Sequence, residues 1–432
     1  MRPESRKLEL PSPNGDFSSV NPLILWVLRT IGAMALAVLG FAAYSTVRIA
    51  IADWIFLEGT PQTVRHAIRL SPGNPAYLSS LAQADPSAAV NALKTAAELS
   101  PVDSGLRIEL GLALEERGDF VDAEASLEKA VELDRTYAPR YVLSEFYVRR
   151  RDASKFWSVA KSALAISYGD VSALFRDCWA LSSDAGAILE NAIPDRPAVL
   201  TAYLNFLLGE GRLAAAAPVA ERVLAKANAE SLTSLLSYCD RLLESGEAEE
   251  AVAVWKELSQ RKLIPYAVPS PEAPDVLTNG DFHLPSIGSA FDWRFSAPAG
   301  IYIDREGTPP AISVSFTGKQ PESTEILSQY VPLLPLRKYQ ISVRYSTKEI
   351  GAESGLQCLL VPFQGVDLLN GAGLLAGGID GDTERAFQFV TGKNTRLARL
   401  VLAYQRMKGT MRIEGTLILR KFSLGSARDD AR

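Results

Sequence analysis

The pattern of hydrophobic and polar positions changes twice along the chain, and each stretch predicts a different kind of structure. Leu23–Val47 is apolar and carries a single charge, Arg29. Residues 50–265 are rich in Ala, Leu, Glu and Arg and contain few runs typical of strands, which favours helices. After Pro265, short apolar alternations are separated by Gly, Pro, Asn and Asp, which predicts strands. The expected fold class is therefore multidomain α + β.

The first stretch is long enough to cross a membrane. Thr30–Val47 holds 18 residues without a charge, and as a helix it would be about 27 Å long, close to a hydrocarbon core of about 30 Å. Arg29 can extend to the interface. Trp26 and Tyr44 lie near opposite ends of the segment, as aromatic side chains do at headgroup level. We expect a single transmembrane anchor over residues 23–48.

Two other interpretations of this segment stay open. A signal peptide could be cleaved at Gly40-Phe41-Ala42, but the region before its apolar core would then be about 29 residues long, and the apolar segment exceeds the usual length. A buried core helix would present a polar face, which the segment lacks. The uncleaved anchor is favoured over both. It follows a polar, proline-containing tail over residues 1–22.

The basic residues that flank the span predict its orientation. Slightly more of them precede the span than follow it closely, and such a bias favours an N-terminus in the cytoplasm. The predicted location is therefore the inner (plasma) membrane, with the domains after the anchor in the periplasm. The residues counted are Arg2, Arg6, Lys7 and Arg29 before the span, and Arg48, Arg65 and Arg69 after it.

The helical region contains internal repeats. Its clearest unit, Ser104–Tyr137, is 34 residues long. Three small residues would let two antiparallel helices approach closely, and a glycine supplies the turn between them. The characteristic residues of this unit are Leu110, Gly111, Gly118, Ala123, Leu127 and Ala130.

Parts of the same pattern recur elsewhere in the region. The spacing of Gly118 and Ala123 is repeated by Gly211/Ala216 and Gly246/Ala251, and Ala-x-x-Leu-x-Pro occurs at Ala67–Pro72 and Ala96–Pro101. Residues 138–171 keep the repeat length, whereas 171–196 are too irregular to assign. The pattern resembles the tetratricopeptide repeat (TPR), over a domain that spans residues 50–264.

Helix pairs of this kind cannot bury their apolar faces alone, so neighbouring pairs stack into an array. The resemblance implies that a peptide or protein binds in a groove formed by the first helix of each pair. Groove contacts inferred from the helical register are Ile108, Leu112, Glu115, Asn205 and Leu208.

A linker and a β-rich region follow. Four prolines between Pro265 and Pro274 predict a semi-rigid spacer over 265–275. Several predicted strands then suggest an antiparallel β-sandwich over 276–425, followed by a short tail over 426–432. The strands are predicted at 311–316, 339–346, 356–363, 385–391, 396–404 and 411–422.

Local motifs sharpen the assignment of the sandwich. Leu277–Phe282 reads Leu-Thr-Asn-Gly-Asp-Phe, and Gln329-Tyr330-Val331 begins a strand that precedes Tyr339. This arrangement resembles the galactose-binding-like jelly roll of many carbohydrate-binding modules. Where that family often places an acidic calcium ligand, this chain has His283, a poor ligand for a hard cation, so we predict no metal site.

Two residues of the sandwich are candidate glycan contacts. The ring of Trp293 could stack on the apolar face of a sugar, with Arg294 beside it. The alternative is that Trp293 is a core aromatic residue.

Composition narrows the chemistry that the chain can perform. It has two His and three widely spaced Cys, which argues against a histidine-rich metalloenzyme, a zinc site or a disulfide framework. Its net charge of −5 gives no global basic surface for nucleic acid. We find no specific catalytic motif and expect neither enzymatic activity nor a cofactor.

The combination of modules predicts a membrane-anchored, non-catalytic scaffold of a bacterial cell envelope. It would bind other envelope proteins through the TPR groove. The layout looks like that of proteins accompanying exopolysaccharide or surface-protein export systems, and this resemblance implies a role in such export. The alternative is a lectin-like protein that binds polysaccharide through the sandwich. A third hypothesis is an unrecognised carbohydrate-active enzyme.

Overall fold

The computed structural model describes residues 22–363, 373–379 and 381–427. The chain divides into two compact units, Met1–Arg150 and Arg151–Arg432. This division falls inside the helical domain that the sequence predicts as a single block. The predicted tails lie outside the described residues, apart from Pro22, Ser426 and Ala427.

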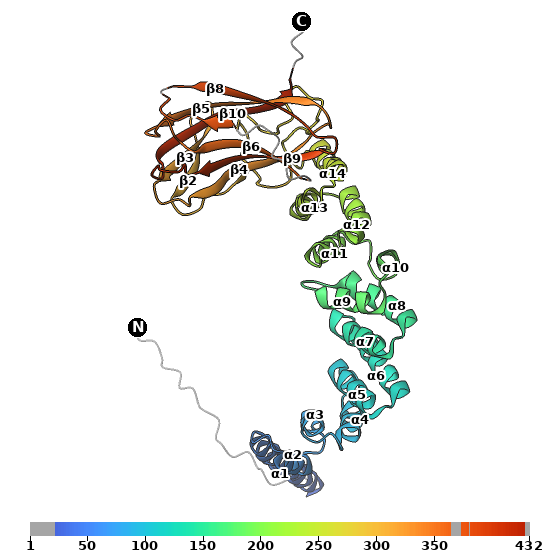
Figure 1. Ribbon diagram of the computed structural model, residues 1–432. Helices are drawn as coiled ribbons and strands as arrows, with labels where there is room; N and C mark the ends of the chain where they lie inside the picture. Colours follow the sequence, from blue (N-terminus) through green and yellow to red (C-terminus); the bar gives the residue numbers. More distant parts are fainter. Residues whose placement is uncertain (1–21, 364–372, 380, 428–432) are drawn as a thin grey trace, which may run out of the picture. The chain divides into compact units, whose positions relative to one another are not determined.

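The first unit is helical (Figure 1). Short turns connect successive helices, and polar side chains at several N-termini satisfy free backbone amides, as the Asp103 carboxylate does for the amide of Leu106. The helices are α1 (Pro22–Phe56), α2 (Pro61–Leu70), α3 (Pro75–Ala84), α4 (Ala89–Leu99), α5 (Ser104–Arg117), α6 (Phe120–Leu133) and α7 (Tyr137–Arg150).

Helix α1 is longer than the predicted anchor, which ended at residue 48. The segment from Arg48 to Phe56 contains no Gly or Pro, so the helix continues to Phe56, and Gly59 in the turn that follows has a positive φ of 66°. Within the described part of the chain, one helix is long and apolar enough to cross a membrane, and it comprises Trp26–Phe56 of α1. A signal sequence near an N-terminus would meet the same criteria.

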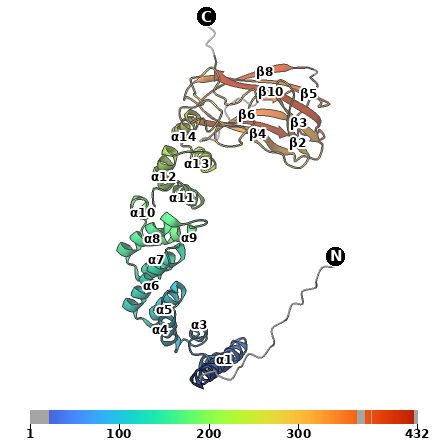
Figure 2. The ribbon, with the colours of Figure 1, turned by 180° about the vertical axis from the view of Figure 1, so that it is seen from behind.

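The second unit begins with seven helices and ends with two β-sheets (Figure 2). The stretch 171–196, which could not be assigned from sequence, forms two short helices. The helices of this unit are α8 (Ala153–Ile166), α9 (Ser172–Leu181), α10 (Ala185–Asn191), α11 (Pro197–Gly209), α12 (Leu213–Ala225), α13 (Leu232–Ser245) and α14 (Ala248–Gln260).

The strands form two five-stranded antiparallel sheets with the orders β1-β4-β9-β6-β7 and β2-β3-β10-β5-β8. Their inner faces share one hydrophobic core, so the sheets form a β-sandwich. The strands are β1 (Arg294–Phe295), β2 (Ile301–Glu306), β3 (Ala311–Thr317), β4 (Ser323–Pro332), β5 (Lys338–Lys348), β6 (Leu356–Pro362), β7 (Gly373–Leu375), β8 (Thr383–Val390), β9 (Leu397–Gln405) and β10 (Glu414–Ser426). The predicted fold class, a helical array with an antiparallel sandwich, is confirmed.

The Asn-Gly motif at the start of the sandwich lies against β10. The amide of Phe422 donates a 2.7 Å hydrogen bond to the carbonyl of Gly280. A Cβ at Gly280 would lie 2.3 Å from the carbonyl oxygen of Phe422, so only glycine permits this approach. The rings of Phe282, Trp293 and Phe422 pack against one another in the core of the sandwich.

The hairpin of α5 and α6 shows why small residues recur in the helical region. A Cβ added at Gly111 would lie 2.6 Å from Cγ of Leu127 and 3.3 Å from the carbonyl oxygen of Ala123. Gly118 ends α5 with a φ of 90°, which lets the chain reverse into α6. The two helices therefore approach as closely as their backbones permit.

We predict that Gly111→Ala destabilises the protein by about 1–3 kcal/mol, because the extra methyl group overpacks the contact with Leu127. Gly209→Ala is the matched control, since a Cβ at this helical glycine meets nothing within 4 Å. The control variant should keep or slightly raise stability. Urea unfolding followed by circular dichroism measures the free energy of unfolding of both variants. Equal values for the two would contradict the close packing of α5 on α6.

Candidate functional site

The predicted groove residues on α5 have different environments. Ile108 is half-buried, whereas Leu112 is 36% exposed. Glu115 accepts two 2.8 Å hydrogen bonds from the guanidinium of Arg149 on α7. This bidentate pair joins two successive first helices, so the carboxylate of Glu115 contributes to packing of the array.

The two predicted groove residues on α11 also differ. Asn205 is exposed. Leu208 is only 8% exposed and lies at the floor of a hollow of about 430 Å³, beside Leu213 of α12 and Arg241 of α13. Leu208 is therefore mainly a packing residue, because little of its side chain is accessible.

A second hollow in the helical region has an apolar floor and a charged rim. Its volume is about 450 Å³, and it lies between α12 and α14, which are the second helices of successive hairpins. Sequence reasoning placed the binding surface on the first helices and missed this one. The lining residues are Ala217, Ala220, Glu221, Leu224, Ala225, Tyr238, Glu250, Ala253, Val254, Glu257 and Arg261.

The charge around this α12–α14 pocket is acidic. Arg261 is paired with Glu257 at 2.8 Å, which leaves Glu221 and Glu250 as the carboxylates that shape the local field. Burial, and after it the charges of Glu221 and Glu250, raises the pKa of Tyr238 at the base of the pocket. The pocket therefore suits an apolar side chain that is flanked by positive charge.

In the sandwich, the structure corrects the predicted glycan contact at Trp293. Its side chain is 0% exposed, and its indole N–H donates a 3.0 Å hydrogen bond to the carbonyl of Asn279. A ring enclosed in this way cannot stack on a sugar. Trp293 is a core residue, as the alternative interpretation of the sequence held.

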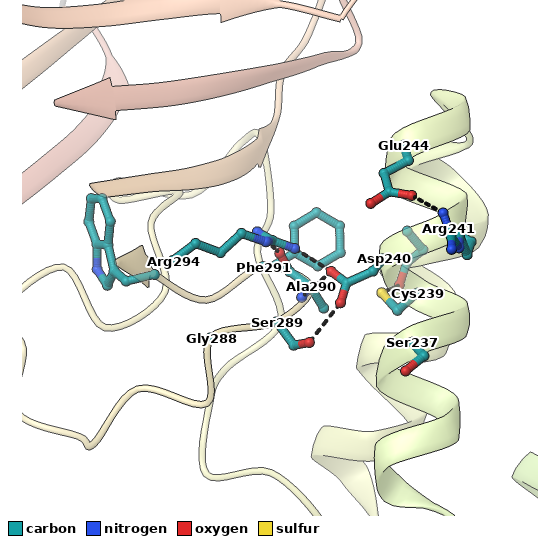
Figure 3. Close-up of polar contacts among 12 residues, drawn as sticks. Ser237, Cys239, Asp240, Arg241, Glu244, Gly288, Ser289, Ala290, Phe291 and Arg294 are labelled. Atoms are coloured by element: carbon teal, nitrogen blue, oxygen red, sulfur yellow. Dashed lines mark hydrogen bonds and ion pairs between the residues drawn. The ribbon is translucent and has the colours of Figure 1, made fainter. Parts of the chain in front are cut away.

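Arg294, the other predicted glycan contact, joins the sandwich to the helices (Figure 3). Its guanidinium pairs with the carboxylate of Asp240 on α13 and donates a 2.8 Å hydrogen bond to the carbonyl of Ala290. Asp240 also accepts hydrogen bonds of 2.7 Å from the amide of Ala290 and from the hydroxyl of Ser289. One carboxylate thus fixes the loop before β1 against α13, and Arg294 is committed to this junction.

The predicted linker packs closely in the same junction. Trp255 of α14 stacks on Tyr266, meets Phe291 edge-on, and donates a 3.0 Å hydrogen bond to the carbonyl of Ala267. The hydroxyl of Tyr266 donates to the buried carboxylate of Asp292 at 3.1 Å. Burial, followed by the charge of Asp292, raises the pKa of Tyr266. The chain after α14 is therefore an ordered part of the junction.

Two further hollows lie on the sandwich. The larger, of about 910 Å³, is formed by the turns after β3, β5 and β9, and its lining is charged, with Arg406 and Arg412 both facing Glu322 at 3.1 and 3.8 Å. The smaller, of about 340 Å³, opens between the edge strands β1 and β2. We call the smaller one the edge pocket.

The edge pocket combines an aromatic ring with polar groups. Phe295 on β1 is 36% exposed, and Asp304 on β2 is exposed beside it. Arg305 is held by hydrogen bonds of 2.9 and 2.6 Å to the carbonyls of Phe282 and His283. Phe295 directly follows the residues that the sequence singled out, but a two-residue strand gave no signal that its ring faces outward.

The three cysteine thiols are buried and are weaker acids than exposed thiols. Burial raises the pKa of the thiols of Cys178 and Cys358 to about 12, and it raises the pKa of the Cys239 thiol as well. Among the described residues, no group of three or more His, Cys, Asp or Glu side chains could hold a metal ion. His283 is exposed and lies 3.0 Å from the carboxylate of Asp281.

No protein-family model and no curated protein matches the chain. Solved structures match its parts. A CBM4 structure has 10% identity and a TM-score of 0.28, with 34% of this chain and 98% of that chain covered. Pseudomonas aeruginosa PilF has 15% identity and a TM-score of 0.26, with 52% of this chain and 94% of that chain covered. YrrB, a TPR protein with an unusual peptide-binding site, has 13% identity and a TM-score of 0.23, with 46% of this chain and 92% of that chain covered. Identities and TM-scores this low carry no argument about activity.

We predict that Asp240→Ala destabilises the second unit by about 2 kcal/mol, because it removes the acceptor from three donors in a partly buried site. Arg241→Ala is the control, since its ion pair with Glu244 is more than half exposed and should change stability by less than about 0.5 kcal/mol. Urea unfolding and limited proteolysis after residue 260 report both changes. Equal behaviour of the two variants would show that Asp240 does not fix the junction.

Proposed function

We propose that the protein is a membrane-anchored, non-catalytic scaffold of the cell envelope that binds a partner protein through the α12–α14 pocket. The anchor is α1, which stays uncleaved, with the N-terminus in the cytoplasm and both units in the periplasm. Export of exopolysaccharide or of surface proteins is the process that this layout suits. The protein performs no reaction itself and needs no cofactor.

The anchoring is supported by helix α1 and its flanking charges. The candidate span Trp26–Phe56 has a mean hydropathy of 1.7, and none of its most apolar window is buried against the rest of the protein. A surface of that kind is stable only in contact with lipid or another apolar partner. The slight excess of basic residues before the span supports the orientation.

The α12–α14 pocket is the observation that carries the binding role. Four alanines, Leu224 and Val254 leave room for a large apolar side chain, and the carboxylates of Glu221 and Glu250 stand at the rim. An amphipathic helix that presents one apolar anchor between Lys or Arg residues would fit this surface. The contacts of Asp240 with Ser289 and Arg294 hold α13, the helix that contributes Tyr238 to the pocket.

We predict that Ala253→Arg weakens partner binding about tenfold or more, because its side chain fills the pocket and opposes a basic partner. Ala214→Arg, at an exposed position of α12 outside the pocket, is the matched control and should bind normally. Wild-type protein and both variants, each full-length and with a photo-crosslinking residue at pocket position 217, would be compared in their own membranes for the partners that they crosslink. Loss of partners with Leu112→Arg but not with Ala253→Arg would instead place binding on the predicted groove.

The edge pocket favours a second candidate function, glycan binding by the sandwich. Phe295 offers a partly exposed ring, and Asp304 and Arg305 on β2, the edge strand of the other sheet, offer an acceptor and a donor. Such a combination can orient the apolar face of a sugar and bind its hydroxyl groups. This site replaces the predicted contact at Trp293.

We predict under this second function that Phe295→Ala weakens glycan binding about fivefold, as expected for one aromatic contact of about 1 kcal/mol. Phe295→Tyr keeps the ring and should retain binding. Calorimetric titration with envelope polysaccharide fragments measures both variants, with thermal melting to confirm that each sandwich is folded. If wild-type protein binds no fragment, or if Phe295→Ala binds as well as wild type, the edge pocket is not a glycan site.

A further inference from the structure

The candidate membrane helix is also the first helix of the helical array. Ala52 of α1, Ala67 of α2 and Tyr77 of α3 are buried in one cluster, and Phe56 packs against it. The hydroxyl of Tyr77 donates a hydrogen bond to the carboxylate of Asp53. Because α1 is continuous from Pro22 to Phe56, the span and the first hairpin are one rigid element.

Helix α2 folds back along α1. Only residues 57–60 connect the two helices, so they run antiparallel, and Ala67 reaches the level of Ala52. With a rise of about 1.5 Å per residue, the turn that begins at Ser71 lies at the same height along the α1 axis as Arg48. Arg69 lies about 3 Å farther along this axis, toward the C-terminal end of α1. The turn between α2 and α3 is thus brought back toward the membrane.

The length of α1 places Arg48, and with it the turn after α2, at the boundary of the hydrocarbon core. Arg29 and Arg48 are separated by about 28 Å along the helix, and a hydrocarbon core is about 30 Å thick. Trp26 and Trp54 are separated by about 42 Å, which matches a bilayer of about 40–45 Å including its headgroups. Trp54 is 69% exposed, as an aromatic residue at the outer headgroup level would be.

The charged groups at this corner fit phosphate. Arg48 lies with its guanidinium 5.9 Å from the ring of Tyr44, and Arg69 is exposed in the last turn of α2. Arg65 is paired with Asp85 and is therefore less free to bind a lipid. Arginine suits phosphate because its guanidinium can donate two parallel hydrogen bonds.

We propose that the α2–α3 corner, with the turn Ser71–Asn74 and the side chains of Arg48 and Arg69, is a lipid-headgroup binding site. The ligand is the phosphate of the lipids around α1, in the leaflet that faces the two units. This inference rests on the anchoring part of the proposed function. It adds that the first hairpin is held on the membrane surface, so the array cannot pivot freely about its anchor.

The test uses full-length protein in vesicles and a probe on the turn. Gly73→Cys is suited to a fluorescent label because a Cβ at Gly73 meets nothing within 4 Å. The native cysteines Cys178, Cys239 and Cys358 are buried, so the introduced thiol is the one that reacts in the folded protein. Val102→Cys is the matched control, since Val102 occupies the corresponding Ser-Pro turn one hairpin further along and is 80% exposed.

Phosphatidylcholine–phosphatidylglycerol vesicles with lipids brominated near the headgroup should quench the probe at position 73 several-fold more than the probe at position 102. Equal quenching at both positions, while the protein resists extraction by alkaline carbonate, would overturn the headgroup site and leave the anchor intact. Extraction by carbonate would overturn both, because α1 would then not span the membrane.

The phosphate contact is tested separately by Arg69→Gln. Each basic residue close to an anionic surface changes the ratio of membrane-bound to unbound corner about fivefold. In Arg69→Gln, quenching at position 73 should therefore fall in anionic vesicles and change little in vesicles of phosphatidylcholine alone. Arg135→Gln removes the same charge from an exposed turn between α6 and α7 and is the control. If Arg69→Gln and Arg135→Gln give the same quenching in anionic vesicles, Arg69 does not bind lipid phosphate.

Discussion

The burial of apolar helix faces by a neighbouring helix is the constraint on which the described structure depends. A hairpin such as α5 and α6 covers only part of its own surface, so each hairpin needs another element beside it. At the N-terminal end of the first unit, Ala52 and Phe56 of α1 meet this need by covering α2 and α3. The close approach of Gly111 to Leu127 shows how little space such packing leaves.

In the second unit, the last hairpin is covered by the sandwich through contacts that are both apolar and directional. Trp255 makes apolar ring contacts with Tyr266 and Phe291, whereas the carboxylate of Asp240 binds Ser289, Ala290 and Arg294 (Figure 3). Apolar contact alone would permit sliding, because dispersion is not directional. A partly buried carboxylate with three donors permits one arrangement only. This explains why Arg294, which the sequence suggested as a glycan contact, is instead held by Asp240 and the carbonyl of Ala290.

The sequence predicts those features that depend on local pattern. Small residues at fixed spacing identified the α5–α6 hairpin, and alternation located β3, β5, β6, β8, β9 and β10 within a few residues. It could not show the features that depend on distant partners: the extension of α1 to Phe56 is stabilised by Tyr77, and the linker is ordered by Trp255. Trp293 and Phe295 illustrate the same limit. Strand β1 holds only Arg294 and Phe295, so no alternation extends to Trp293 that could assign its ring to the core and that of Phe295 to the surface.

The distribution of charge separates two kinds of contact in an acidic chain. The corner of α2 and α3 presents Arg48 and Arg69, whereas the rim of the α12–α14 pocket presents Glu221 and Glu250. At physiological salt, electrostatic effects fade over about 8 Å, so each group acts only on what touches it. An acidic rim repels anionic headgroups and favours a basic protein. A basic corner attracts anionic headgroups and repels a basic protein. A net charge of −5 therefore conceals two local surfaces of opposite charge, and the proposed scaffold would use this separation to bind a basic partner protein at one surface and lipid phosphate at the other.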